Sequence, residues 1–376
     1  MVKSLHPFQI FVKPAGARCN LSCRYCYYLE KDSLFSEGHT SRMPEILLEE
    51  YIVQHIEASP ETVIRFSWHG GEPTILGLDY FRKIISLQKK HIPPGRRFAN
   101  GIQTNGTLLD ESWGRFLAEE GFSVGLSLDG PQDIHNRYRR HRNGRASFKQ
   151  ALRGYEILRR YGVNTDILCV VNQHNSRVPL TVYGFFKEIG ASYITFLPCV
   201  DRQPDGLVFP FSVQADAWGK FLCTIFDEWM DQDIGRIKVQ IFEEAARTAF
   251  RQEHSLCIFR PACGDIPVLE NNGDLYACDH FVDRKHLLGN IIETPLVELL
   301  KKTTAFGRLK KDSLPRFCRQ CEVLDMCNGG CPKNRFVETP DGETGLNYLC
   351  SGYRRFFNHC RPWVDAVSDE WRRRKS

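Results

Sequence analysis

The sequence has no long hydrophobic run, because no stretch approaches the roughly 18 consecutive apolar residues that a membrane-spanning helix needs. The residues before Pro14 also lack the long apolar segment and small-residue cleavage site of a signal peptide. An excess of one charge is missing too, since 50 Lys and Arg against 45 Asp and Glu leave a net charge of only +5. The basic stretch 372–375 is more typical of a solvated end than of a nucleic-acid-binding arm. We therefore expect a cytoplasmic protein that binds neither membranes nor nucleic acid.

One short motif lacks a residue that its chemistry normally needs. Cys19, Cys23 and Cys26 form a C-x3-C-x2-C pattern, and the next cysteine along the chain is Cys169. Iron–sulfur clusters and structural zinc sites are normally held by four protein ligands. Three thiolates can hold three corners of a cubane [4Fe–4S] cluster, which leaves the fourth iron open to a substrate or cofactor. The alternative is three buried cysteines that bind no metal.

Cysteine itself is abundant, with 15 residues of this type. Because thiols stay reduced in the cytosol, metal binding or redox chemistry explains them better than disulfides do. One group lies late in the chain: Cys257, Cys263, Cys278, Cys318, Cys321, Cys327, Cys331 and Cys350. Eight thiols divide into two four-ligand sites, and the C-x2-C spacing leaves zinc open as an alternative to iron–sulfur clusters. Others are expected to be core or surface thiols: Cys169, Cys199, Cys223 and Cys360.

The first 200 residues alternate between two patterns. β-rich runs occur at 8–14, 62–68, 98–104, 122–128, 164–171 and 193–198. Apolar residues at helical spacing occur between them at 45–58, 78–91, 110–121, 148–162 and 178–190, and Asp110 is expected to cap the third of these helices at its N-terminus. Such alternation predicts parallel βα units, in either an open doubly wound sheet or a partial barrel. In both folds, ligands bind at the carboxyl ends of the strands, where the three-cysteine motif stands.

These motifs resemble a known family. The three-cysteine motif, with Tyr25 before its third cysteine, and the HGGEP segment at 69–73 are similar to the signatures of radical S-adenosylmethionine (SAM) enzymes. The cysteine-rich end resembles the twin-cluster SPASM domain. Segments such as QTNGTLLDESW and GLNYLCSGYRRFF narrow the resemblance to anaerobic sulfatase-maturating enzymes. The resemblance implies an α/β fold, with a partial parallel (β/α)6 barrel over 1–235, a linker helix over 236–256 and a SPASM domain over 257–376.

The resemblance also implies a reaction and its cofactors. In that family SAM binds the open iron, and its cleavage yields a 5′-deoxyadenosyl radical that takes a hydrogen atom from Cβ of a Cys or Ser in a sulfatase. The product is Cα-formylglycine. Three [4Fe–4S] clusters are implied, and a low-potential donor such as flavodoxin or ferredoxin supplies electrons. The first auxiliary cluster is expected on Cys257, Cys263, Cys278 and Cys331, and the second on Cys318, Cys321, Cys327 and Cys350.

Individual roles follow from matching positions in the family motifs. Asp279, directly after a cluster ligand, is implied as the general base for the substrate. Glu72 is implied to hold the SAM ammonium group, beside glycines that let the backbone approach SAM closely. The implied SAM-binding residues are Tyr25, Gly70, Gly71, Glu72, Asn105, Ser127 and Arg139. The implied substrate contacts are Tyr28, His69 and Gln103.

His69 departs from the family pattern, which has Gln before Gly-Gly-Glu-Pro. A histidine can still donate a hydrogen bond, and it can titrate near neutral pH. Related SPASM enzymes that crosslink ribosomally made peptides can carry His there, so a peptide-crosslinking maturase is the alternative function. A zinc-binding interaction protein is the alternative outside enzymes. The expected substrate is a sulfatase segment of the C-x-P-x-R or S-x-P-x-R type.

Overall fold

The computed structural model describes residues 3–29, 31 and 42–375. Two compact units make up the chain, and each is assembled from separate stretches. Unit 1 takes residues 1–127, 136–165 and 264–307, and unit 2 takes 128–135, 166–263 and 308–376. Because this division groups residues by contact and not by chain order, the predicted domains 1–235, 236–256 and 257–376 stay predictions. No helix in the described ranges is long and apolar enough to cross a membrane.

Unit 1 is built on a sheet whose strands follow the order β10-β9-β8-β1-β2-β3-β4. The strands are β1 (Phe11–Val12), β2 (Val63–Trp68), β3 (Arg97–Thr104), β4 (Ser123–Ser127), β8 (Val268–Leu269), β9 (Asp274–Tyr276) and β10 (Leu287–Asn290). β1 to β4 are parallel, and β8 joins the free side of β1, also in parallel. Antiparallel pairing then adds β9 and β10. A late segment of the chain thereby lies beside the first strand.

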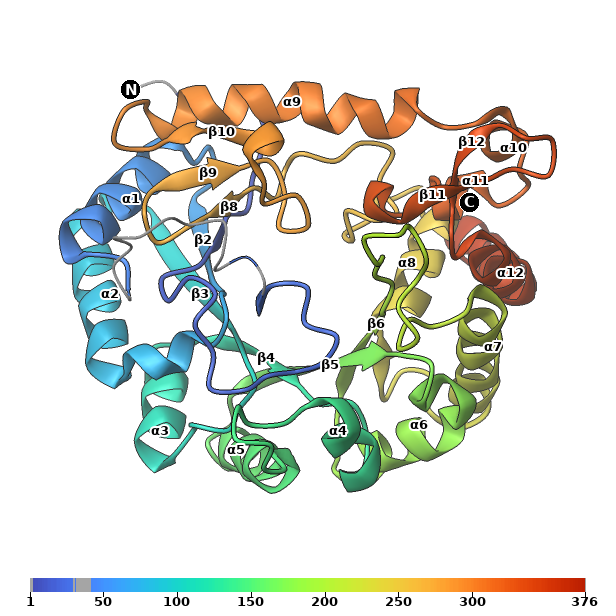
Figure 1. The fold of residues 1–376 in the computed structure, drawn as a ribbon, viewed down its shortest axis with the longest axis horizontal. Coiled ribbons are helices and arrows are strands. Elements are labelled where there is room, and N and C mark those ends of the chain that lie inside the picture. Colours follow the sequence, from blue (N-terminus) through green and yellow to red (C-terminus); the bar gives the residue numbers. More distant parts are fainter. Residues whose placement is uncertain (1–2, 30, 32–41, 376) are drawn as a thin grey trace. The chain divides into compact units, whose positions relative to one another are not determined.

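Helices cover one face of the parallel strands in unit 1. They are α1 (Glu45–Ala58), α2 (Leu78–His91), α3 (Glu111–Glu119) and α5 (Phe148–Arg160); unit 1 also contains the short 3₁₀ turns η2 (Pro73–Leu76) and η4 (Arg284–His286) and most of α9 (Leu296–Asp312). Figure 1 shows α1, α2 and α3 outside β2, β3 and β4, while the dark blue chain that follows β1 lies on the inner side. As the sequence suggests, Asp110 caps α3 by accepting a hydrogen bond from Trp113 N at 3.0 Å. The apolar stripe of α3 then buries Trp113 and Phe116 against the unit.

Unit 2 combines three parallel strands with helices and a small hairpin. Its strands are β5 (Asn164–Val171), β6 (Tyr193–Pro198), β7 (Lys238–Val239), β11 (Arg335–Glu338) and β12 (Thr344–Asn347). Its helices are η3 (Asn175–Arg177), α6 (Pro179–Glu188), α7 (Ala215–Gln232), α8 (Gln240–Ala249), α10 (Arg316–Arg319), α11 (Leu324–Cys327), η5 (Pro332–Asn334) and α12 (Cys350–Lys375), and α4 (Gln132–Tyr138) draws on both units. Phe226 on α7 meets Phe242 on α8 and Phe356 on α12 at ring distances of 5.2 and 6.0 Å. These aromatic contacts form the core between the helices of unit 2.

The predicted α/β class is confirmed, and each β-rich run of the first 200 residues contains a strand. Pairing of residues 268–269 with β1 was not predicted. These residues are a short apolar pair without the alternation that marks a strand. Their place depends on the tertiary structure, and it decides which side chains meet at the candidate site.

Candidate functional site

The first site lies in the loop that follows β1. Leu21 N donates a hydrogen bond to Cys19 Sγ at 3.3 Å, and Asn105 Nδ2 donates to the same sulfur at 3.8 Å. Burial raises the pKa of the Cys19 thiol to about 11, and the nearby Glu72 carboxyl adds to the shift. A bound cation is what turns such a thiol into a thiolate. With Cys23 and Cys26 also half-buried in this loop, the donor set fits an iron–sulfur cluster.

The carboxyl group of Glu72 is held beside this loop. Its Oε1 accepts hydrogen bonds from the hydroxyls of Thr74 at 2.6 Å and Thr104 at 2.7 Å, and its Oε2 accepts one from Asn105 N at 2.7 Å. The side chain is buried, and burial raises its pKa. Oε1 also accepts a hydrogen bond from Thr74 N at 3.0 Å, whereas Oε2 accepts only from Asn105 N among the described residues, so Oε2 retains capacity for an ammonium ligand.

The glycines before Glu72 allow two backbone segments to touch. Gly70 has a φ of +127°, which a side chain rarely tolerates. Glu72 N donates to Arg18 O at 2.9 Å, so the Gly-Gly-Glu segment is bonded to the residue directly before Cys19. A Cβ placed on Gly71 would stand 2.2 Å from Arg18 O. The loop that carries the cysteines therefore needs glycine at position 71.

Four further predicted residues lie in two contacting pairs. Gln103 Nε2 donates to Ser127 Oγ at 3.1 Å, which joins the ends of β3 and β4. The guanidinium carbon of Arg139 lies 5.4 Å from the centre of the Tyr25 ring, a cation–π distance. Tyr25 and Arg139 are both buried. The assignment of these residues to SAM and substrate stays a prediction.

A buried ionic network surrounds Asp279. Its carboxylate forms an ion pair with Lys13 and accepts a hydrogen bond from the Tyr27 hydroxyl. Burial by itself would raise the pKa of Asp279, but the positive charge of Lys13 holds it below its usual range. Lys13 is only 2% exposed, so its charge acts in a largely water-free setting.

Tyr28 belongs to the same network. The Lys13 Nζ lies 3.1 Å from the centre of the Tyr28 ring, and the Tyr28 hydroxyl donates a hydrogen bond to Glu270. Sequence reasoning singled out Tyr28 and Asp279 but missed Lys13, Tyr27 and Glu270. Their place in the sequence could have pointed to Lys13 and Glu270, because each residue directly follows a short apolar strand, β1 for Lys13 and β8 for Glu270.

His69 lies within electrostatic reach of this network. Its ring stacks on Phe11, with ring centres 4.0 Å apart and planes at 15°. Burial lowers the pKa of His69 to about 4, with Asp279 opposing the shift and Lys13 adding to it. His69 is therefore neutral near pH 7, like the Gln that the family carries at this position.

In unit 2, four predicted ligands converge. One pocket is lined by Phe317, Cys318, Cys321, Val323, Leu324, Cys327, Gly329, Leu346, Asn347, Cys350 and Arg354. Burial raises the pKa of Cys327 to about 12, and the neighbouring Cys350 adds to the shift. Four thiols around one mostly apolar pocket fit an iron–sulfur cluster. Their identity as its ligands stays a prediction.

A second group in unit 2 brings three predicted ligands together. Burial raises the pKa of Cys257 to about 11, and the neighbouring thiols Cys331 and Cys263 add to the shift. The buried Lys310 donates from Nζ to the carbonyl oxygens of Cys257 and Ile258, at 2.8 Å in both cases. The fourth predicted ligand, Cys278, belongs to unit 1 and stays a prediction. In the part of the chain that the structure describes, no three His, Cys, Asp or Glu side chains form a group that could hold one metal ion.

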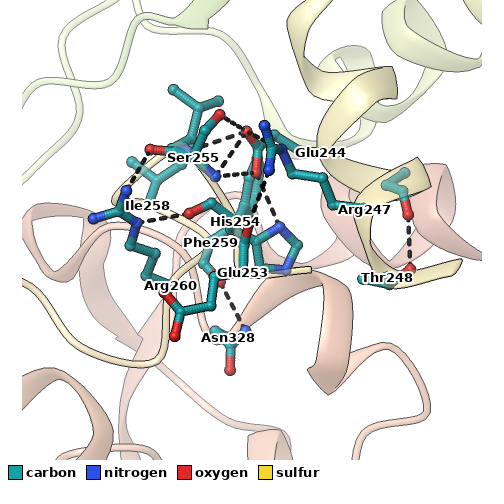
Figure 2. Close-up of polar contacts among 12 residues, drawn as sticks. Glu244, Arg247, Thr248, Glu253, His254, Ser255, Ile258, Phe259, Arg260 and Asn328 are labelled. Carbon is teal, nitrogen blue, oxygen red and sulfur yellow. Dashed lines mark hydrogen bonds and ion pairs between the residues drawn. The ribbon is translucent and has the colours of Figure 1, made fainter. Parts of the chain in front are cut away.

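The segment before Cys257 is fixed by Glu244 of α8 (Figure 2). The carboxylate of Glu244 accepts hydrogen bonds from His254 Nδ1 at 3.0 Å and from Ser255 N at 3.0 Å. Burial opposes ionisation of Glu244, but these bonds hold its pKa below the usual range. Arg260 turns back and donates from Nε to His254 O at 2.7 Å. The loop on either side of Cys257 is thus anchored to a helix.

The cysteines that were assigned no role lie outside these groups. Three are buried and one is half-buried: Cys169, Cys199, Cys360 and, half-buried, Cys223. Their burial is in keeping with plain core thiols.

Comparison with known proteins identifies the chain's family. Residues 14–178 match the Radical SAM superfamily, and residues 257–322 match the SPASM iron-sulfur cluster-binding domain. The serine-type anaerobic sulfatase-maturating enzyme of Bacteroides thetaiotaomicron is 42% identical, over 97% of this chain and 92% of the relative. The cysteine-type enzyme of Clostridium perfringens (strain ATCC 13124) is 33% identical, over 96% of this chain and 99% of the relative.

A solved structure agrees with these relatives. Native anSMEcpe with bound AdoMet and Cp18Cys peptide matches with a TM-score of 0.88 and 33% identity, over 97% of this chain and 100% of that chain. The resemblance drawn from the cysteine motifs is therefore confirmed. The chain belongs to the anaerobic sulfatase-maturating enzymes, a family of radical SAM enzymes with an iron–sulfur SPASM domain.

Proposed function

We propose that this enzyme oxidises a Cys or Ser side chain in a sulfatase polypeptide to Cα-formylglycine. The observation that carries the proposal is the partly buried Asp279 carboxylate, paired with Lys13 and Tyr27 in the same unit as the three-cysteine loop. Lys13 also contacts Tyr28, the predicted substrate-contacting residue. Serine-type and cysteine-type relatives support the reaction, and the substrate segment is expected to be of the C-x-P-x-R or S-x-P-x-R type.

Residues of unit 1 would hold the reactive group. Cys19, Cys23 and Cys26 would bind three irons of a [4Fe–4S] cluster, and Glu72 would bind the ammonium group of SAM. When bound, the cluster and SAM supply the radical that removes a hydrogen atom from the substrate Cβ. Around them, the remaining predicted contacts with SAM are Tyr25, Gly70, Gly71, Asn105, Ser127 and Arg139. Tyr28, His69 and Gln103 would contact the substrate peptide.

The chain's own carboxylate would complete the oxidation. After Cβ has lost a hydrogen atom, the substrate S–H or O–H gives a proton to Asp279 and one electron leaves the substrate. Altogether the side chain loses two hydrogens. A serine becomes the aldehyde directly, whereas a cysteine becomes a thioaldehyde that water hydrolyses with release of hydrogen sulfide.

Two auxiliary [4Fe–4S] clusters would carry the electron away. The ligand sets proposed for them are Cys257, Cys263, Cys278 and Cys331 for the first and Cys318, Cys321, Cys327 and Cys350 for the second. Asp279 follows Cys278 directly in sequence, so proton and electron would leave the substrate near the same place. With the cluster on the three-cysteine loop, the chain would hold about twelve irons. Flavodoxin or ferredoxin is the proposed electron donor.

The test is anaerobic incubation of the reconstituted enzyme with SAM, a reductant and matched peptides that carry C-x-P-x-R or S-x-P-x-R. Mass spectrometry should show formylglycine in at least one peptide. Asp279→Asn should keep SAM cleavage and lose product formation by about 100-fold or more. Asp283→Asn, which changes a half-exposed carboxylate of the same loop, should keep both.

Three results would contradict the proposal. SAM cleavage without any aldehyde would refute the reaction, and a crosslinked peptide would favour the peptide-crosslinking maturase instead. Equal loss of SAM cleavage and product in Asp279→Asn would make Asp279 a structural residue. Stoichiometric zinc without iron and sulfide would overturn the cluster assignment.

A further inference from the structure

Glu270 is a fully buried carboxyl that the proposed reaction does not use. It stands directly after β8 and is 0% exposed. Lys13 N donates to Leu269 O at 2.8 Å, which holds the end of β8 against the chain that follows β1. The Tyr28 hydroxyl donates to Glu270 Oε1. The strand pairing therefore places the Glu270 carboxyl next to the hydroxyl of Tyr28, a predicted substrate contact.

The two carboxyls near Lys13 differ in what surrounds their oxygens. Asp279 meets Lys13 with Oδ1 and the Tyr27 hydroxyl with Oδ2. Glu270 accepts from Tyr28 with Oε1, whereas its buried Oε2 has no hydrogen-bond partner among the described residues. Buried polar atoms are nearly always paired, so an oxygen with free acceptor capacity requires an explanation. Because its second oxygen has no donor, the Glu270 anion is stabilised by fewer contacts than the Asp279 anion, so Glu270 takes up a proton more readily.

We propose that Glu270 is a second proton acceptor of this active site, reached from the substrate through the Tyr28 hydroxyl. The inference rests on the proposed function. As the substrate S–H or O–H bond breaks, its proton passes to Tyr28 Oη, and the Tyr28 proton passes to Glu270 Oε1. Tyr28 ends neutral and Glu270 ends protonated. The electron passes to an auxiliary cluster, as it does when Asp279 accepts the proton directly. The substrate therefore loses the same number of protons and electrons by both routes.

The surroundings of Glu270 suit this role near neutral pH. Burial raises the pKa of Glu270 to about 7, while Lys13 and the Tyr28 hydrogen bond oppose the shift and Asp279 and Asp274 add to it. These groups come from the chain after β1, from β9 and from the segment after β9. An acid–base group works best when its pKa is close to the working pH. Ionised Glu270 accepts the proton, so product formation should rise as pH increases through about 7.

The experiment adds Glu270→Gln, Tyr28→Phe or both to Asp279→Asn, in which the direct route is closed, and follows product formation between pH 6 and 9. Tyr276→Phe is the matched control, because this buried tyrosine belongs to the same apolar cluster and its hydroxyl makes no hydrogen bond with a described residue. Formylglycine formation, SAM cleavage and peptide affinity are measured separately. Infrared spectroscopy of the wild-type and Glu270→Gln proteins follows the protonated carboxyl band across the same pH range.

Relative to Asp279→Asn alone, we expect added Glu270→Gln or Tyr28→Phe to lower the remaining product formation by about 100-fold and to remove its rise with pH. SAM cleavage should persist, and adding both substitutions should lower product formation no more than adding either one, because the two residues act as a unit. A carboxyl band should disappear near pH 7 in wild type and be missing from Glu270→Gln. Added Tyr276→Phe should keep the profile of Asp279→Asn.

Each of the following outcomes would contradict a specific part of the proposal. A pH profile unchanged from that of Asp279→Asn after either added substitution would overturn the role of Glu270, as would additive losses when both are added. If Glu270→Gln fails to assemble its clusters, Tyr28→Phe decides alone, since it removes only a hydroxyl. Absence of formylglycine from wild type would refute the proposed function, while the infrared titration would still report whether Glu270 changes charge near pH 7.

Discussion

The substitution Gly71→Ala tests one close backbone contact between the Gly-Gly-Glu segment and the three-cysteine loop. The new Cβ would stand 2.2 Å from Arg18 O and 2.5 Å from Ala17 O, whereas real Cβ atoms essentially never come within 3.0 Å. All three atoms are constrained, because Gly71 N donates to Gly16 O at 2.8 Å and both carbonyls are backbone. The added methyl group therefore has to push the chain before Cys19 away.

The cost follows from the size of that displacement. Relieving the overlap needs a shift of about 1 Å, and such overpacking costs about 1–3 kcal/mol. Lengthening the backbone hydrogen bond from Glu72 N to Arg18 O adds about 1 kcal/mol. A total near 3 kcal/mol corresponds to about a 100-fold loss of affinity when SAM binding needs the undisturbed loop.

The assay is SAM affinity and iron content of anaerobically reconstituted protein. Gly101→Ala is the matched control in β3, because its Cβ would meet no neighbouring heavy atom closer than 3.9 Å. We expect Gly71→Ala to bind SAM about 100-fold more weakly and Gly101→Ala to match wild type. If Gly71→Ala bound SAM within about twofold of wild type with full iron, the steric argument would be wrong.

Three shorter predictions concern other parts of the chain. Lys13→Met removes the cation paired with the partly buried Asp279 and should destabilise the protein by up to about 3 kcal/mol, measured as a loss of thermal stability that Lys13→Arg partly restores. Cys350→Ala should lower the iron content by about four atoms per chain and keep SAM cleavage; unchanged iron would remove Cys350 from the ligand set. Burial lowers the pKa of His69 to about 4, so its ring stays neutral from pH 6 to 8. The contribution of neutral His69 to the free energy of unfolding is lost only as the pH falls from the pKa that this histidine has in the unfolded chain toward 4. Peptide affinity should accordingly be the same at pH 6 and 8 and survive His69→Gln, and a pH-dependent affinity that vanishes in this variant would contradict the neutral form.

Local pattern was enough to predict six strands and five helices in the first 200 residues. The helix at 78–91 coincides with α2, and Asp110 caps α3 as expected, because both depend on residues within one or two turns. The division of Cys318, Cys321, Cys327 and Cys350 from the other late cysteines came from the family resemblance, and their shared pocket agrees with it. Spacing alone left that division open, since a cluster joins thiols from distant loops.

Sequence by itself determined the α/β class and the position of the three-cysteine motif, because these depend on short-range periodicity and on residue spacing. The radical SAM and SPASM assignment came from the resemblance of these motifs to a known family. Only the tertiary structure decided that β8 pairs with β1. That pairing joins residues more than 250 positions apart, and it brings Glu270 to Tyr28 and Asp279 to Lys13. Long-range pairing is set by the burial of strand faces and by loop closure over the whole chain, neither of which a local pattern encodes.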